Sequence, residues 1–263
     1  MITCEEIYDL HTTGALESAL CEAYREIPLD SRNSMRKNDT PLHMACAFVD
    51  ENAVRILLER GADVNVRNDD GDTPLCVLAK RKCCGKETTI AGIAGLLVSK
   101  EARVPRSGKN TTALIEAVGN RHFLMADILL MSGCRIDSTN SNGNNVLHVI
   151  CQSAGDIAYD IKRTKERIAD FSERWYSEKD KREAYENMEY LEEADRQCFL
   201  TAKRILENGQ IDTEDKNNIG KTALDIAWET GARRIGALLS GQDPDTDELS
   251  ALIGGLDVFQ ALW

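Results

Sequence analysis

The chain has 263 residues, 42% hydrophobic and 29% charged, a balance that favours a folded protein over a disordered one. The formal net charge of −12 argues against broad binding to nucleic acids or anionic membranes and is compatible with a basic partner. Aromatic residues make up only 5%, so we expect an aliphatic core. The longest run without a polar residue, Ile90 to Val98, is too short to span a bilayer.

The N-terminus and the cysteines both favour a cytoplasmic protein. The first residues, Met-Ile-Thr-Cys-Glu-Glu, carry no basic start and no cleavage motif, so we expect no secretory signal. Nine scattered cysteines, without an export signal, are typical of reduced thiols that act as small core residues. Cys83 and Cys84 differ because they lie in a basic stretch, where cations lower a thiol pKa. We interpret them as incidental loop thiols, since no zinc-ligand spacing accompanies them.

A short motif recurs along the chain at a spacing of about 33 residues. Thr-Pro-Leu begins at Thr40 and Thr73, Thr-Ala-Leu begins at Thr112 and Thr222, and Asn-Val-Leu-His begins at Asn145. Two of the four spacings are 33 residues, one is 39, or 33 plus 6, and the last is 77, or 33 plus 44. The pattern predicts 33-residue units, two of which carry insertions.

Each unit predicts a pair of helices. Thr40-Pro41 begins the first helix, because threonine caps well and proline at the first helical position loses no needed hydrogen bond. The second helix holds Val54 to Leu58, and Gly61 is placed to end it in the left-handed region. Asp70-Gly71 then forms a tight turn. One such pair cannot bury its own apolar face, so we expect neighbouring pairs to stack.

These features together resemble the ankyrin repeat, whose signature is a Thr-Pro-Leu-His opening, two antiparallel helices and a Gly-Ala-Asp-Val ending before a β-turn finger. Residues 40–65 are a nearly full match, and the resemblance extends over residues 7–240. It implies an all-α ankyrin-repeat solenoid of about five units. It also implies that the signature histidines, His43 and His148, make structural hydrogen bonds between neighbouring units.

The 44-residue insertion is expected to form an antiparallel coiled-coil hairpin. It is dense in charge, but its apolar residues recur at spacings of three and four, which argues against disorder. The run from Ile157 to Trp175 pairs with the run from Ala184 to Ile205 if the chain turns at Lys179-Asp180, which places Thr164 opposite Asp195. About 22 residues per arm give roughly 33 Å of projection. The alternative is a separate small bundle docked against the stack.

Five parts of the chain follow from these patterns. They are an N-terminal capping repeat at 1–39, repeats at 40–155 with a short insertion near 81–89, the hairpin at 156–197, the end of the fourth repeat and a C-terminal capping repeat at 198–240, and an acidic and apolar tail at 241–263.

No motif points to catalysis. His43 and Cys46, like His148 and Cys151, are three residues apart, a spacing that suggests metal ligands or a thiol–imidazole pair. Both pairs, however, occupy signature positions of the repeat, where such residues are structural. The sequence has no glycine-rich phosphate loop and no His-Glu-x-x-His motif. We therefore expect no enzyme, no cofactor and no metal site.

Ankyrin-like stacks bind proteins on the concave side, through their finger tips and the exposed ends of their first helices. Transferring those positions to this chain gives Arg36, Lys37, Asp39, Phe48, Asp69, Asp70, Asp72, Lys80, Arg81, Lys109, Asn120, Asn142, Asn144, Gln152, Lys221 and Glu229. Arg36, Phe48 and Arg81 are the expected hot spots, because arginine and aromatic residues contribute most to interfaces.

The tail is a second candidate site. Its end carries Leu256, Phe259, Leu262 and Trp263 at helical spacing, and an apolar end with two aromatic residues is expected to be covered. We expect the tail to cap the last repeat of a monomer. The alternative is docking into a partner's groove or onto a second copy of the chain, which would give a dimer.

The function we expect is that of a non-enzymatic, cytoplasmic module that binds an unidentified protein, with no nucleic acid or membrane as partner. Host-cell cytosol is the location if the protein comes from a pathogen or a virus. The alternative is an acidic inhibitor or immunity-type protein that neutralises a basic enzyme or toxin. An enzyme using Cys83 or Cys84 is the third hypothesis.

Overall fold

The computed structural model describes residues 2–82, 85–102, 113–134, 136–172, 176–209 and 211–242. The helices are α1 (Cys4–Thr12), α2 (Glu17–Glu26), α3 (Pro41–Phe48), α4 (Glu51–Glu59), α5 (Pro74–Ala79), α6 (Glu87–Ser99), α7 (Ala113–Gly119), α8 (Phe123–Met131), α9 (Val146–Ala169), α10 (Glu178–Glu207), α11 (Ala223–Thr230) and α12 (Arg233–Leu239), with a 3-10 turn, η1, at Asp170–Ser172. Over these ranges the only strand-like pairing is an antiparallel bridge between Asn33 and Asp39, so the expected all-α class is confirmed. None of the described helices is both long and apolar enough to cross a membrane.

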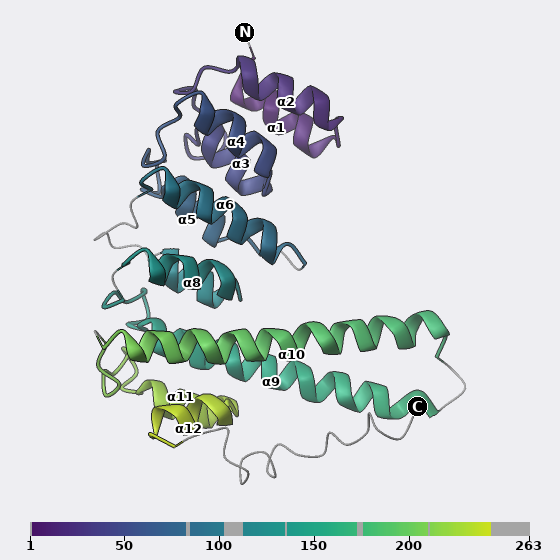
Figure 1. Ribbon diagram of the computed structural model, residues 1–263, viewed down its shortest axis with the longest axis vertical. Coiled ribbons are helices and arrows are strands. Elements are labelled where there is room, and N and C mark those ends of the chain that lie inside the picture. The colour runs from purple at the N-terminus through teal and green to yellow at the C-terminus, as the bar shows by residue number, and fades with distance from the viewer. Residues whose placement is uncertain are drawn as a thin grey trace. The chain divides into compact units, whose positions relative to one another are not determined.

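The chain divides into two compact units, Met1–Val146 and Leu147–Trp263. In the first unit four helix pairs stack in two layers (Figure 1). The first helices of the pairs pack in the order α1, α3, α5 and α7, and the second helices pack in the order α2, α4, α6 and α8. Each pair therefore buries its apolar face against the next, as the repeat pattern predicts.

The helix ends in this unit follow the sequence signals. The side chains of Thr40 and Thr73 cap α3 and α5, each with proline in the first turn. Gly61 has φ of +87°, and the chain leaves α4 there through a hydrogen bond from Ala62 N–H to the Leu57 carbonyl. Most of the large buried side chains are aliphatic, as expected, with Tyr24 and Phe123 as the aromatic exceptions.

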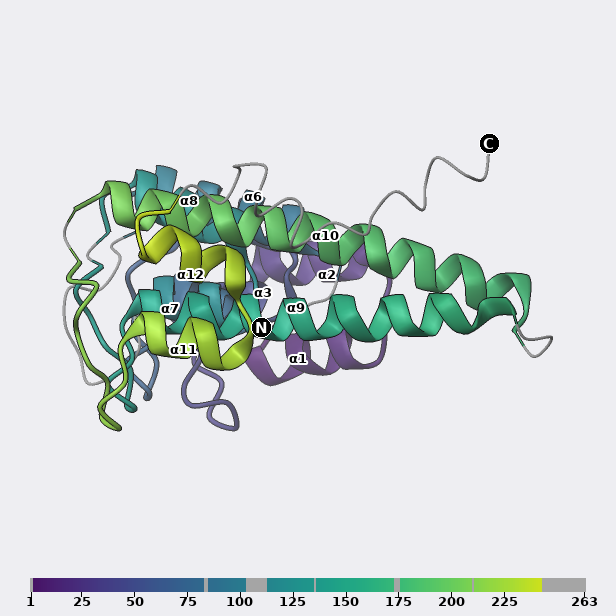
Figure 2. The same ribbon diagram turned by 90° about the horizontal axis from the view of Figure 1, so that it is seen from below.

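In the second unit α9 and α10 lie side by side as an antiparallel hairpin (Figures 1 and 2). Helices α11 and α12 pack on the hairpin near the start of α9 and the end of α10. The Thr230 hydroxyl of α11 donates to the Cys151 carbonyl of α9 at 3.3 Å, and α12 packs on α10. The two long helices are thus the helices of a repeat, extended into the expected hairpin.

The register of the hairpin differs from the predicted one. Asn187, and not Asp195, meets Thr164, through a side-chain hydrogen bond of 3.2 Å. Asp195 instead pairs with Arg234 of α12 at 3.3 Å. The prediction placed the turn inside α10, whereas that helix already begins at Glu178, after the N-cap Ser177. Trp175, the predicted tip residue, lies outside the described residues.

Candidate functional site

An arginine and three rings gather where α1, the first finger and α3 meet. The Arg36 guanidinium carbon lies 4.4 Å from the centre of the Tyr8 ring, and Nη2 donates to the Tyr8 hydroxyl at 2.8 Å. The Tyr8 and Phe48 ring centres are 5.6 Å apart. Phe48 in turn stacks on His11, with centres 4.0 Å apart and planes within 8°. We call Tyr8, His11, Arg36 and Phe48 the ring cluster.

His11 fixes the cluster to the core. Its Nε2 lies 2.9 Å from the hydroxyl of the buried Tyr24 and 3.8 Å from the Asp50 carboxylate. Burial lowers the pKa of His11 below its ordinary value, against the opposing effect of Asp50. The imidazole is therefore neutral at neutral pH. Its ring stacks on Phe48 and holds that side chain in place.

The outer part of the ring cluster is accessible. Arg36 is exposed, whereas Tyr8 and Phe48 are half-buried. Over the described residues, the Tyr8 hydroxyl is the single hydrogen-bond acceptor of the Arg36 side chain. A guanidinium has five N–H donors, so most of them remain for solvent or a partner. Two of the three predicted hot spots, Arg36 and Phe48, thus both lie against Tyr8.

Several predicted finger residues bind one another. Lys37 forms an ion pair with Asp70, which raises the pKa of Lys37 through their hydrogen bond. The Asn38 amide donates to Asp69 at 2.8 Å, and the Asn68 amide donates to Asp39 at 2.8 Å. These contacts join the first finger to the second. Because Lys37 and Asp70 are 63% and 38% exposed, solvent screens the ion pair and its contribution to stability is small.

Asp72 and Lys80 also have a structural role. Asp72 is buried, and its carboxylate lies 2.6 Å from the Lys80 ammonium. Its backbone carbonyl is 3.0 Å from Nε2 of His43. The backbone N–H of Thr40 donates to Nδ1 of His43 at 3.2 Å, so the proton of the neutral ring is on Nε2 and is donated to Asp72. His43 therefore links one repeat to the next finger, as the resemblance implies.

The remaining predicted residues are dispersed. Arg81 and Gln152 are exposed, and the Asn120 amide donates to the Ala79 and Glu116 carbonyls at 3.0 Å. Asn142 and the buried Asn144 both donate backbone N–H groups to Oδ1 of Asn140 in a finger turn. Lys221 pairs with Glu229 in the second unit. Residues outside the described ranges are Lys109, Leu256, Phe259, Leu262 and Trp263.

Sequence reasoning missed Tyr8 and His11. Both lie on α1, three residues apart and therefore on one helix face. The prediction treats 1–39 as a capping repeat, and it transfers no binding positions to the two helices of that repeat. Two rings at helical spacing on its first helix were the signal that could have found them.

The paired histidines contact backbone carbonyls, and the paired cysteines are buried. Nε2 of His148 lies 3.0 Å from the Lys221 carbonyl, matching the contact of His43. Burial raises the pKa of Cys151 to about 12 and that of Cys46 further. Within the described ranges, no three His, Cys, Asp or Glu side chains are grouped so that they could hold a metal ion.

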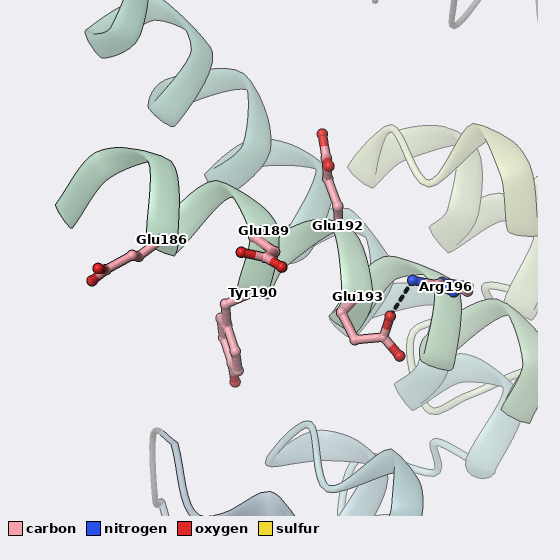
Figure 3. A pocket seen from close by; sticks show the side chains of 6 residues that line it. All are labelled: Glu186, Glu189, Tyr190, Glu192, Glu193 and Arg196. Atoms are coloured by element: carbon pink, nitrogen blue, oxygen red, sulfur yellow. Dashed lines mark ion pairs between the residues drawn. The ribbon is translucent and has the colours of Figure 1, made fainter. Parts of the chain in front are cut away.

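A shallow, acidic depression lies on the exposed side of α10. Its volume is about 470 Å³, and its lining residues are Glu186, Glu189, Tyr190, Glu192, Glu193 and Arg196 (Figure 3). Arg196 forms an ion pair with Glu193, so three further glutamates give this surface a negative charge.

Comparison with known proteins supports the repeat assignment. A family model described as ankyrin repeats (many copies) matches residues 27–76. The chain is 34% identical over 68 residues, 23% of its length, to the ankyrin repeat-containing protein P1E11.10 of Schizosaccharomyces pombe. It is 26% identical over 201 residues, 72% of its length, to the phosphocholine transferase AnkX of Legionella pneumophila. The chain spans 33% and 20% of these two proteins.

The geometry and the comparisons agree. Helix pairs with threonine caps stack in the first unit, and the signature histidines bond to the following finger. Together with the matching family model, this shows that the chain contains ankyrin repeats.

Proposed function

We propose that the protein is a non-enzymatic interaction module, and that the ring cluster is the anchor of its binding surface. The observation that supports this is the geometry of Arg36, which is exposed yet held by Tyr8 through a stacking contact and a hydrogen bond. Arginine and aromatic residues contribute most at interfaces, and a side chain already fixed in place loses less entropy on binding.

The chemistry of the cluster suggests the class of partner. The remaining guanidinium donors suit a carboxylate, which an arginine can bind through two parallel hydrogen bonds. The half-buried faces of Tyr8 and Phe48 lie next to it and suit an apolar side chain. A protein segment with an acidic residue beside an apolar one fits both features.

The transferase named among the relatives does not change this proposal. Phosphocholine transfer is in the name of a protein of which this chain spans 20%. The residues that we assign to the surface stack on one another, join neighbouring fingers or expose hydrogen-bond donors. We infer a binding role and no transferase role for this chain.

Capture from lysate tests the proposal. The full chain, Arg36→Glu and Phe48→Ala serve as baits, with bound proteins identified by mass spectrometry. Arg25→Glu is the matched control, because it makes the same charge change on an exposed position of α2. We expect both cluster variants to lose a partner that the control retains, with circular dichroism unchanged. Equal capture by all four baits would exclude the ring cluster as the anchor.

An acidic inhibitor is the second candidate function. The acidic depression on α10 and the net charge of −12 favour a basic partner at that surface. Charge-steered binding weakens steeply with salt, whereas binding anchored by rings does so much less. Glu189→Lys with Glu192→Lys should slow association with the captured partner only if this second function holds.

A reducing compartment such as the cytoplasm suits either function. The seven described cysteines, Cys4, Cys21, Cys46, Cys76, Cys134, Cys151 and Cys198, are all free thiols. Reduced thiols in the core are typical of cytoplasmic proteins. Secretion into an oxidising medium would contradict this location.

A further inference from the structure

The last described helix pair leaves an apolar face open. Trp228 of α11 is 54% exposed, although an edge of its ring rests on Gly236 of α12, where a Cβ would meet ring carbons at 3.4 and 3.5 Å. Leu224 lies one turn before Trp228, and Leu239 lies one turn after Gly236; both are half-buried. We call these four residues the Trp228 face.

Such a face needs a cover. Repeat stacks are soluble when their terminal repeats present a polar outer side. Here the terminal pair presents an indole, and large exposed apolar groups that lie together mark an interaction site. The described chain ends at Gln242, three residues past Leu239, so no later described element packs on this face.

The segment that follows has the matching pattern. Leu249, Leu252, Leu256, Phe259 and Trp263 are spaced three, four, three and four residues apart, which predicts one apolar stripe along a helix. Residues 249–263 would extend about 21 Å as a helix, enough to cover both α11 and α12. All of these residues lie outside the described part of the chain.

The connection is long enough and leaves α12 at the right end. Gly241 has φ of +71°, and the Gln242 N–H donates to the Ala237 carbonyl at 2.9 Å, so the chain turns back sharply after Leu239. Six residues, 243–248, then span up to roughly 20 Å when extended, which exceeds the length of α12. They include four acidic residues, which favour solvent over the apolar face.

We propose that residues 249–263 fold back onto the Trp228 face of the same molecule and close the repeat stack. The apolar stripe covers the indole, Leu224 and Leu239, and the opposite side of the segment faces solvent. This inference does not depend on the partner or on the ring cluster.

Trp228 itself is the reporter for the test. Trp175→Phe with Trp263→Phe leaves Trp228 as the sole tryptophan of the full chain. Acrylamide quenching of its fluorescence is compared with that of the same chain ended after Gln242. We expect the quenching constant to rise about twofold on shortening, since the ring is then open to solvent. We also expect the melting temperature to fall by several degrees. Equal quenching in both proteins would overturn the proposal.

Point variants of the full chain keep the test valid if the shortened chain folds poorly. Phe259→Asp places a charge on the stripe and should reproduce the rise in quenching, whereas Ala261→Asp, on the opposite side of the expected helix, should not. Sedimentation velocity at several protein concentrations shows whether the segment that covers Trp228 belongs to the same molecule or to a second copy. A monomer whose Trp228 is protected at every concentration supports the proposal. Protection that appears only with dimer formation would assign the face to a second copy and contradict it.

Discussion

The side-chain amide of Asn187 donates a hydrogen bond of 3.2 Å to the hydroxyl of Thr164 between the two arms of the hairpin. Thr164 is buried, so its hydroxyl requires a partner, and Asn187 supplies one from the edge of α10. Further toward the base, the Cys198 thiol lies 3.8 Å from the Ile150 carbonyl. Both contacts fit one register, in which α9 and its 3-10 turn end at Ser172 and α10 begins at Glu178.

Cross-linking distinguishes this register from the one expected from sequence. Thr164→Cys with Asn187→Cys should form a disulfide on mild oxidation, because the native side chains are in contact. Thr164→Cys with Asp195→Cys should not, since residues 187 and 195 are eight positions, or about 12 Å, apart along α10. Non-reducing peptide mapping identifies the bond. A bond to position 195 would restore the register predicted from the apolar spacing.

The sequence predicted that the hairpin exists but not its register. Spacings of three and four identify two apolar stripes, and such stripes can slide past each other by a whole number of turns. The turn decides between these positions. Ser177 and Asp180 exchange side-chain and backbone hydrogen bonds as a capping box, which starts α10 before the predicted turn. That motif is present in the sequence and was the overlooked signal.

The candidate site was predicted in part. Arg36 and Phe48 were transferred from the repeat pattern, which fixes the finger tip and the end of the first helix. Tyr8 was missed, because it belongs to a repeat too degenerate for such transfer. The pattern also could not show that Lys37 and Asp70 pair with each other. Which exposed charges contact one another depends on how the fingers pack, and a periodicity does not contain that information.

Gly155 and Thr230 give the second prediction. Gly155 lies inside α9, and a Cβ there would clash with the Thr230 side chain of α11. Gly155→Ala should therefore lower the free energy of unfolding by about 1–3 kcal/mol, despite the better helix propensity of alanine. Gly95→Ala in α6 is the matched control, since nothing lies within 4 Å of its Cβ position, and it should stabilise by up to about 1 kcal/mol. Urea unfolding of both variants measures the difference. Stabilisation by Gly155→Ala would contradict the close approach.

Stability should also fall on mild acidification. Burial lowers the pKa of His43 below its ordinary value of 6.5, and the same cause acts on His11 and His122. The unfolded chain then binds more protons than the folded chain, so the free energy of unfolding decreases as the pH falls below about 6.5. Protonation of Nδ1 also removes the acceptor of the Thr40 N–H. Urea unfolding from pH 7.5 to 5 checks the direction.

A variant assigns part of this pH dependence to one residue. His43→Ala should lose about 1–3 kcal/mol at pH 7.5 and show a shallower decrease toward pH 5. The carboxylates that cap helices, such as Asp225, have a lowered pKa and titrate below this range. Stability that rises on acidification, or a slope unchanged in the variant, would show that His43 is not held neutral by the fold.

Thiol labelling gives the fourth prediction. Burial raises the pKa of Cys4 and Cys151 to about 12 and that of Cys134 to about 11, whereas Cys21 is half-buried. At pH 8 a thiol of pKa 12 is ionised in only about one molecule in 10⁴, and the thiolate is the nucleophile. Among the seven described cysteines, iodoacetamide should therefore label Cys21 first, and the buried thiols only as fast as the protein opens.

Mass spectrometry after timed labelling measures each site in one experiment. Adding urea should bring all of the buried thiols to one common rate, because exposure then becomes the same for each. Labelling of Cys151 as fast as Cys21 in the native protein would contradict the packing of α9 against α11. The same data include Cys83 and Cys84, which lie outside the described residues. If the basic stretch around them activates either thiol, that site must be labelled faster than Cys21, and a slower rate would remove the last argument for a cysteine enzyme.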